Sequence, residues 1–369
     1  MSLMSNAFLV TILLGTVLVF AAGVWLWPRL ARRSWRAVLG RVGLILTAQV
    51  LVLASVGLVA NRTFLLYASW GDLFAGQKTE ASQQGGDLPG GVAVKVLGRQ
   101  KPEVPGSAEP RSAGVVEKVM LKGERSRQGG EAYVYLPPEY FQKGNEHRKF
   151  PAAVVLTGYP GMAENLVRNL KYPRTAWTLA KEKKMPPTIL VMMRPTVVPF
   201  NSQCIDIPGG PATETFFGTD LPKTIAGAYR TGTQARDWGI IGDSTGGYCA
   251  LKMGLQHQET YSVAIGLSAD YKPEVDAQSG DLFHGDKKLE KRSDLMTNLE
   301  KLPKGKSSFL VTTSLIGESN LKPTREFVEK VKDRANVSSI TLDSGGHGFN
   351  TWRREIPPAM EWMGARLGK

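Results

Sequence analysis

Two apolar segments without a charged residue lie close together in the sequence, at residues 7–27 and 42–60. Each is close to the roughly 20 residues that an α-helix needs to cross the apolar core of a bilayer. The connection between them carries five arginines, at positions 29, 32, 33, 36 and 41. Because clusters of positive charge stay on the cytoplasmic side, we expect a two-helix transmembrane hairpin over residues 1–61. The rest of the chain then lies on the outer side of the cell membrane.

Two other readings of these segments stay open. A cleaved signal peptide has its positive charge ahead of one shorter apolar stretch, whereas here the charge follows the first stretch and a second comes after it. The segments could also be two buried core helices. The hairpin fits the order of charge and apolar residues best.

The chain carries 46 Lys and Arg against 33 Asp and Glu, a net charge of +13. Five of these positive charges lie in the arginine-rich connection, and the remaining excess is spread through loops such as residues 287–292. This distribution argues against nucleic acid as a partner. It suits a domain beside an anionic membrane or wall surface, although ordinary solubility charge explains it equally well.

Residues 62–112 separate the apolar segments from the rest of the chain. Their first part is aromatic, from Phe64 to Phe74, and is typical of side chains at the headgroup level of a membrane. From about Gln77 to Ser112 the sequence is rich in Gly, Pro, Ser and Gln without sustained periodicity. We expect an interfacial segment followed by a linker.

From residue 113 to 369, short apolar runs alternate with amphipathic stretches of helical length. Two opening strands, at residues 115–120 and 132–136, are predicted to pair across a turn-rich segment. Continuous Val, Ile and Leu runs separated by helices then indicate a parallel sheet covered on both faces. The predicted later strands are residues 152–156, 188–193, 238–242, 262–267, 309–313 and 337–342. The predicted helices are residues 164–181, 213–230, 246–256, 321–334 and 351–367. This order predicts an α/β-hydrolase fold, a mostly parallel central sheet flanked by helices.

The pentapeptide Gly242-Asp-Ser-Thr-Gly246 satisfies the pattern G-x-S-x-G between an apolar strand and an amphipathic helix. A serine on a sharp turn there exposes its hydroxyl, and the positions two before and two after it must be small. The helix N-terminus also stabilises a developing anion. Ser244 is therefore the predicted nucleophile, although a plain glycine-rich turn is the simpler alternative.

A serine hydroxyl needs a base, and the chain has four histidines. His147 lies in a charged loop, His257 is carried away by the helix that follows Ser244, and His284 lies in a polar segment. His347 follows the last predicted strand in a glycine-flanked loop, so it is the predicted base.

Glu318, at the end of the preceding strand, is the predicted acid that orients the imidazole. Asp343 competes for this role because it is closer to His347 in sequence. The predicted oxyanion donors are the backbone N–H groups of Thr245 and Tyr159, the latter in the glycine-containing loop after residue 156.

The chain resembles the esterase D and mycolyltransferase branch of the α/β-hydrolases from about residue 114 to the C-terminus. The resemblance is carried by residues 134–140, 156–159, 214–216 and 242–247, by Glu318, and by residues 345–352. It implies that the triad falls on Ser244, Glu318 and His347, and that the acid is Glu.

Only two cysteines are present, which excludes a disulfide-rich scaffold and a multi-cysteine zinc site. Both Cys204 and Cys249 are expected near the site. Outside the cytoplasm a disulfide between them is permitted, and two buried thiols are equally compatible with the sequence.

The sequence therefore predicts a membrane-anchored, extracytoplasmic serine esterase without cofactor or metal, acting on an ester or lipid-like substrate. An acyltransferase that passes the acyl group to a sugar or lipid hydroxyl shares the same acyl-enzyme. A non-catalytic binding protein of the cell envelope is the alternative of another class. Residues 271–306 are expected to form a lid or an acyl-pocket wall. The sequence leaves the oligomeric state open.

Overall fold

The computed structural model describes residues 5–64, 93–106, 109–274, 279–297, 299, 305 and 307–368. The chain divides into two compact units, Met1–Gln77 and Lys78–Lys369. The predicted interfacial stretch, apart from Phe64, lies outside the described residues. The same holds for the first part of the predicted linker and for parts of the 271–306 segment.

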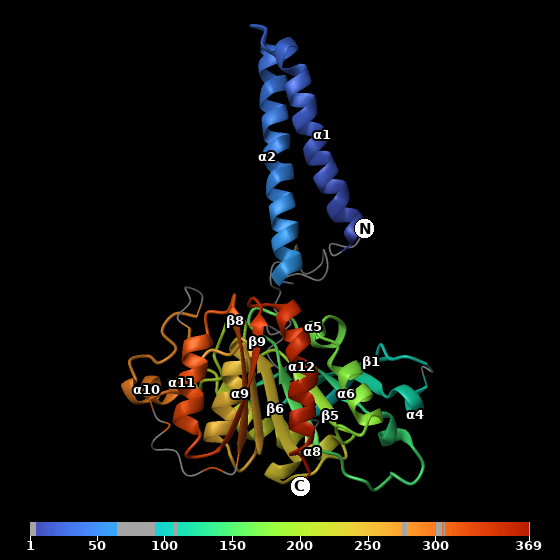
Figure 1. The fold of residues 1–369 in the computed structure, drawn as a ribbon, viewed down its shortest axis with the longest axis vertical. Helices are drawn as coiled ribbons and strands as arrows, with labels where there is room; N and C mark the ends of the chain where they lie inside the picture. The colour runs from blue at the N-terminus through green and yellow to red at the C-terminus, as the bar shows by residue number, and fades with distance from the viewer. Residues whose placement is uncertain are drawn as a thin grey trace. The chain divides into compact units, whose positions relative to one another are not determined.

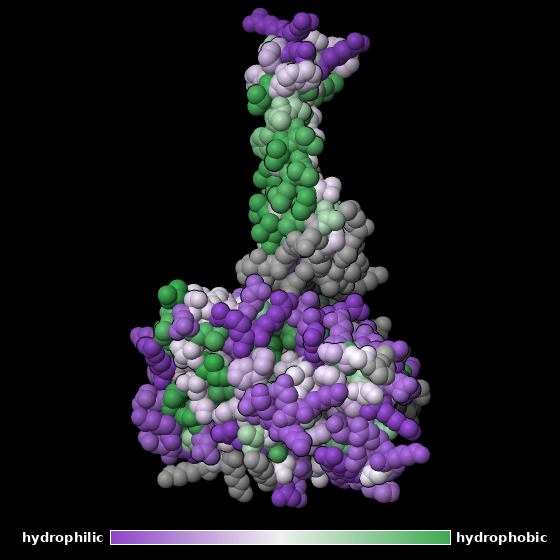
Figure 2. All heavy atoms as spheres, turned by 45° about the vertical axis from the view of Figure 1, so that its right-hand side comes forward, coloured by the Kyte–Doolittle hydropathy of each residue, from purple (hydrophilic) through white to green (hydrophobic). Residues whose placement is uncertain are grey.

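Two long helices, α1 (Asn6–Leu30) and α2 (Trp35–Phe64), form the first unit and pack against each other. Thr16 Oγ1 lies 3.1 Å from Ser55 Oγ across their contact. Both helices are long and apolar enough to cross a membrane, and little of their apolar stretches is buried by protein. Figure 2 shows apolar side chains along most of the length of α1 and α2, and polar side chains at the end where the connection between the two helices lies. Membrane spans and a signal sequence are both compatible with this pair.

The second unit is built on one sheet with strand order β1-β2-β3-β5-β4-β6-β7-β8-β9 (Figure 1). The pairs β1/β2, β2/β3 and β3/β5 are antiparallel, and the other neighbouring strands are parallel. The strands are β1 (Val94–Gln100), β2 (Val115–Lys122), β3 (Gly129–Leu136), β4 (Ala152–Leu156), β5 (Ile189–Met193), β6 (Trp238–Asp243), β7 (Val263–Leu267), β8 (Ser308–Ile316) and β9 (Asn336–Ser344). The predicted mostly parallel sheet is confirmed.

Helices lie on both faces of this sheet. The helices are α4 (Pro110–Ala113), α5 (Ala163–Arg168), α6 (Tyr172–Lys181), α7 (Thr213–Thr215), α8 (Leu221–Ala228), α9 (Thr245–Gln256), α10 (Lys287–Ser293), α11 (Leu321–Val331) and α12 (Phe349–Gly364). Successive side chains of β6 point to opposite faces. A side chain at Gly239 would meet Met363 of α12. Its neighbour Ile240 instead packs in the core that includes the buried residues of α9. Hence α9 and α12 cover opposite faces.

Three local predictions differ from the structure. The helix predicted over 164–181 is broken into α5 and α6, because Lys171 has a φ of 55° and Pro173 lies in the first turn of the next helix. The helix predicted over 213–230 contains a π-helical turn at Phe216–Asp220. The strand β1 lies inside the segment expected to be linker, where it pairs with β2 at the edge of the sheet.

Candidate active site

Ser244 occupies a sharp turn between β6 and α9. Its backbone has φ 54° and ψ −124°, a conformation that non-glycine residues rarely adopt. A Cβ at Gly242 would lie 2.3 Å from the backbone of Gly246. A Cβ at Gly246 would lie 2.4 Å from the carbonyl oxygen of Thr157. The two glycines therefore allow the close backbone approach that keeps this turn in place.

The imidazole of His347 lies beside the serine hydroxyl. His347 follows β9 in the loop that precedes α12, and its Nε2 is 2.8 Å from Ser244 Oγ. The ring also packs edge-on against Trp352, with the centroids 5.5 Å apart. An Nδ1–H directed at a carboxylate leaves Nε2 unprotonated, so that it accepts the serine proton.

Glu318 is that carboxylate. Its side chain is fully buried after β8, and its Oε2 lies 3.5 Å from His347 Nδ1. Its other oxygen accepts a hydrogen bond of 2.7 Å from the Ser268 hydroxyl, which fixes the carboxylate. The contact with the ring is longer than an ordinary hydrogen bond, as is common in enzymes without bound substrate. Asp343, the competing acid, is exposed in β9.

Three carboxylates act on the imidazole of His347. The polar contact with Glu318 and its charge raise the pKa of His347 above its usual value. Partial burial of the ring opposes this, and the charges of Asp270 and Asp243 add to it. The surroundings therefore favour the imidazolium form, which is the form that arises when the base takes the serine proton.

The loop of residues 157–161, here called the oxyanion loop after its predicted role, follows β4 and lies against Ser244, the predicted nucleophile. A Cβ at Gly158 would lie 3.1 Å from the Ser244 Cβ. The Gly158 N–H donates a hydrogen bond of 2.8 Å to Asp243 Oδ2. Tyr159 is the next residue, and Thr245 begins α9. First-turn N–H groups of a helix have no partner within the helix. The structure thus brings both predicted oxyanion residues to the same side of the site as Ser244.

A disulfide joins Cys204, in the loop before α7, to Cys249 of α9, with the Cα atoms 5.7 Å apart. A buried cation stands next to this bridge. Lys252 Nζ donates to the Cys204 carbonyl oxygen at 2.6 Å and lies 2.9 Å from Glu214 Oε2. Arg292 also pairs with Glu214. The loop that carries Cys204 is therefore tied to the nucleophile helix at several points.

The other three histidines lie elsewhere. His257 ends α9 and its Nε2 is 3.2 Å from Glu214 Oε1, so it belongs to the ion cluster around Lys252. His147 and His284 are exposed in loops. Among the described residues, no group of three or more His, Cys, Asp or Glu side chains is arranged to hold a metal ion.

Sequence reasoning missed two carboxylates of the site. Asp270 follows β7, and burial together with the charges of Glu274 and Glu318 raises its pKa to about 6. Asp243 directly precedes Ser244, the predicted nucleophile, and burial raises its pKa to about 7. Both residues come at or just after the carboxyl end of a parallel strand, as do Ser244 and Glu318. This position at the end of a parallel strand is the sequence feature from which the two carboxylates could have been predicted.

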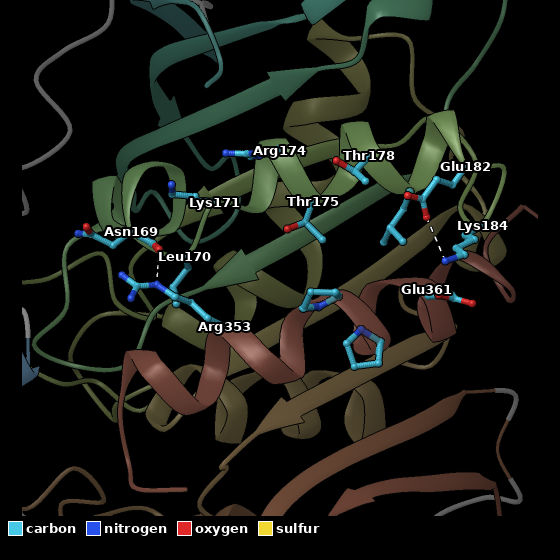
Figure 3. A pocket seen from close by; sticks show the side chains of 13 residues that line it. Asn169, Leu170, Lys171, Arg174, Thr175, Thr178, Glu182, Lys184, Arg353 and Glu361 are labelled. Atoms are coloured by element: carbon cyan, nitrogen blue, oxygen red, sulfur yellow. Dashed lines mark hydrogen bonds and ion pairs between the residues drawn. The ribbon is translucent and has the colours of Figure 1, made fainter. Parts of the chain in front are cut away.

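A groove of about 830 Å³ runs between α6 and α12 (Figure 3). At one end Arg353 donates to the carbonyl oxygen of Asn169 at 2.8 Å, and at the other Lys184 pairs with Glu182 at 3.0 Å. Ser244, Glu318 and His347 are not among its lining residues. The groove is therefore separate from the triad.

Solved structures with the same fold are esterases and related hydrolases. A ferulic acid esterase matches with a TM-score of 0.58 and 18% identity, over 68% of this chain and 98% of that one. An S-formylglutathione hydrolase from Agrobacterium tumefaciens matches with a TM-score of 0.57 and 17% identity, over 74% of this chain and 100% of that one. The fluorophosphonate-binding serine hydrolase F of Staphylococcus aureus matches with a TM-score of 0.55 and 16% identity, over 67% of this chain and 96% of that one.

At the sequence level, a protein of uncharacterised function from Corynebacterium glutamicum is 24% identical in an alignment of 342 positions. The alignment covers 88% of this chain and 76% of that protein. The family described as "Putative esterase" matches residues 127–363. This match contains β6, α9, Glu318 and His347, and it confirms the resemblance seen in the sequence. The chain belongs to this esterase family and is a hydrolase with the α/β-hydrolase fold.

Proposed function

We propose that this protein is a membrane-anchored serine esterase that hydrolyses carboxylic esters outside the cytoplasm. The observation that carries the proposal is the 2.8 Å separation of Ser244 Oγ and His347 Nε2 at a strained turn between strand and helix. A hydroxyl so placed has a base within hydrogen-bond reach of the proton that it must lose.

The reaction begins when Ser244 Oγ attacks the ester carbonyl carbon and its proton passes to His347 Nε2. The carbonyl oxygen becomes an oxyanion, which the N–H groups of Thr245 and Tyr159 stabilise. Glu318 holds the ring and stabilises the imidazolium. The C–O bond then breaks, and the leaving alcohol takes the proton from His347.

Water completes the cycle. His347 takes a proton from a water molecule, whose oxygen attacks the acyl carbon of the Ser244 ester. Collapse of the second oxyanion breaks the bond to Oγ, which recovers its proton from the imidazolium. The products are one carboxylic acid and one alcohol, and the enzyme returns unchanged.

Separate observations support the proposed location. Two apolar helices joined by an arginine-rich connection support a membrane anchor whose connection faces the cytoplasm. The Cys204–Cys249 disulfide supports an oxidising compartment for the second unit. Together they favour a catalytic unit at the outer side of the cell membrane.

Substitution of Ser244 by Ala tests the proposal. We expect the variant to lose hydrolysis of a short-chain p-nitrophenyl ester by at least about a thousandfold, and to lose labelling by a fluorophosphonate probe. The double change with His347→Ala should cost little more, because members of a triad act as a unit. Ser262→Ala, at the opposite end of the sheet, is the control. Full labelling of the Ser244→Ala variant would show that Ser244 is not the nucleophile. If an added alcohol accepts the acyl group and no free acid forms, the proposal of a hydrolase is wrong.

A further inference from the structure

Asp243 is a buried carboxylate immediately before the predicted nucleophile. Only 2% of the residue is exposed. Its Oδ2 accepts the N–H of Gly158 at 2.8 Å, whereas its Oδ1 is buried without a hydrogen-bond partner among the described residues. The side chain therefore joins the end of β6 to the oxyanion loop, which follows the neighbouring strand β4.

The burial of the Asp243 carboxyl lowers the stability of the fold. A buried polar atom without a partner costs about 1–3 kcal/mol. Asp243 also lies on the face of the sheet that α12 covers. There the buried carboxyl of Glu355 and the buried hydroxyl of Tyr172 are its polar neighbours, and neither gives a hydrogen bond to Asp243 Oδ1. An apolar residue of similar size would avoid this desolvation.

The oxyanion loop depends on this contact. Two of its other hydrogen bonds are internal, from the Gly161 N–H to the Gly158 carbonyl oxygen at 2.9 Å and from the Thr157 hydroxyl to the same oxygen at 2.7 Å. Two more tie it to the end of β5 and the segment that follows, from the Thr157 N–H to the Met193 carbonyl oxygen at 3.2 Å and from the Tyr159 hydroxyl to the Pro199 carbonyl oxygen at 3.4 Å. These four bonds do not reach β6 or α9. The bond to Asp243 does, and it acts on the distance between the loop and Ser244 because Asp243 and Ser244 are adjacent in the chain.

We propose that Asp243 is a positioning residue for catalysis, which holds the oxyanion loop against the nucleophile through the Gly158 N–H. The inference rests on the proposed serine esterase function. Because the N–H of Tyr159 follows Gly158 directly, the carboxyl of Asp243 sets where the second oxyanion donor stands relative to the attacked carbonyl.

The expected consequence is a loss in kcat without a matching change in KM. Oxyanion donors act on the charge that develops in the transition state, and the ground-state ester gains little from them. Removing such a donor outright costs about 100- to 1,000-fold in kcat. A donor that is displaced but still present should cost less, about 10- to 100-fold.

Asp243→Leu and Asp243→Asn separate positioning from folding. Leucine removes the acceptor and also the unpartnered carboxyl oxygen, so the two effects on the free energy of unfolding offset each other. We expect Asp243→Leu to keep a thermal midpoint within a few degrees of the wild type and to lose kcat by about 10- to 100-fold. Asparagine keeps a carbonyl oxygen for the Gly158 N–H, so Asp243→Asn should retain kcat within about threefold.

Asp220 provides a matched control. It is also buried, and it accepts the backbone N–H groups of Arg125 and Ser126 at 3.1 and 2.8 Å, away from Ser244. Asp220→Leu should lower the thermal midpoint and leave kcat per folded molecule within about twofold.

The inference is overturned if Asp243→Leu keeps the wild-type kcat, or if Asp243→Asn is as impaired as Asp243→Leu. Either result leaves the proposed function intact as long as Ser244→Ala is inactive. Activity in Ser244→Ala would instead reject the proposed function itself.

Discussion

Ser244 holds a backbone conformation that costs about 1–3 kcal/mol, and its neighbours keep it there. Backbone atoms fill the space where side chains at Gly242 and Gly246 would lie, and Gly158 closes the turn from the oxyanion loop. A side chain at Gly242 or Gly246 would therefore force the backbone of this turn to shift. The strain thus places the hydroxyl within 2.8 Å of the imidazole, so stability lost at one residue serves the chemistry of the site.

At the residue scale, Glu318→Gln should change the pH dependence of the reaction. The contact with Glu318 and its charge raise the pKa of His347, and only the neutral imidazole acts as a base. Activity of the wild type should therefore rise with pH through an inflection above 6.5, the usual pKa of a histidine side chain. In Glu318→Gln the inflection should move to lower pH while kcat falls by at least about tenfold. The measurement is kcat/KM of a neutral ester from pH 5 to 9.

Asp343→Asn is the matched control for this experiment. The Asp343 carboxylate is exposed in β9, whereas Glu318 is the carboxylate within 3.5 Å of the ring. The control should keep both the inflection and the rate. An inflection that moves in Asp343→Asn and stays in Glu318→Gln would assign the acid to Asp343.

At the scale of helices and strands, the parallel core was predictable because its strands are buried on both faces and read as continuous apolar runs. The strands β4, β6 and β7 are buried along their whole length. The edge strand β1 was not predictable, because most of its residues are exposed and its pairing with β2 leaves no apolar pattern in the sequence. The break between α5 and α6 depends on one left-handed residue, Lys171, which no periodicity reveals.

The candidate site shows the same limit. Ser244, Glu318 and His347 could be proposed from order and position, because each follows a strand of the parallel sheet. The hydrogen bond from Gly158 to Asp243 could not, because it joins residues 85 positions apart whose contact depends on the pairing of β4 with β6. The choice between a disulfide and two thiols likewise needed the distance between the loop and α9.

The Cys204–Cys249 disulfide gives a prediction at this scale. It closes a loop with a sequence separation of 45 residues between two elements beside the site. Replacing both cysteines by Ala should lower the free energy of unfolding by about 2–4 kcal/mol, because the unfolded chain gains freedom. Urea unfolding of the wild type with and without a reducing agent is the measurement. The double variant is the control, since it should not respond to the reductant. An equal response of both proteins would assign the effect to something other than the bridge.

The whole molecule joins an apolar helix pair to a catalytic unit that contains every residue of the predicted triad. Many apolar side chains of α1 and α2 are exposed in the described part of the chain. Their burial in a bilayer would remove that surface from water, which is the dominant favourable term for such segments. The site residues, in contrast, make their described contacts within residues 78–369. Attachment and chemistry should therefore be separable.

Replacing residues 1–77 by a cleavable export signal should yield a soluble enzyme, whereas the full chain should stay with the membrane fraction after an alkaline carbonate wash. We expect kcat of the soluble form on a short-chain ester to lie within about twofold of the full chain, because no triad residue is removed. Export is needed so that the disulfide can form.

The orientation of the anchor gives a separate prediction. A protease added to intact spheroplasts should digest a C-terminal tag on the full chain, as the arginine-rich connection predicts. A tag that is protected from the protease would show that the anchor has the opposite orientation. The mass of the mature protein tests for a signal peptide, because loss of residues 7–27 would contradict the two-helix anchor.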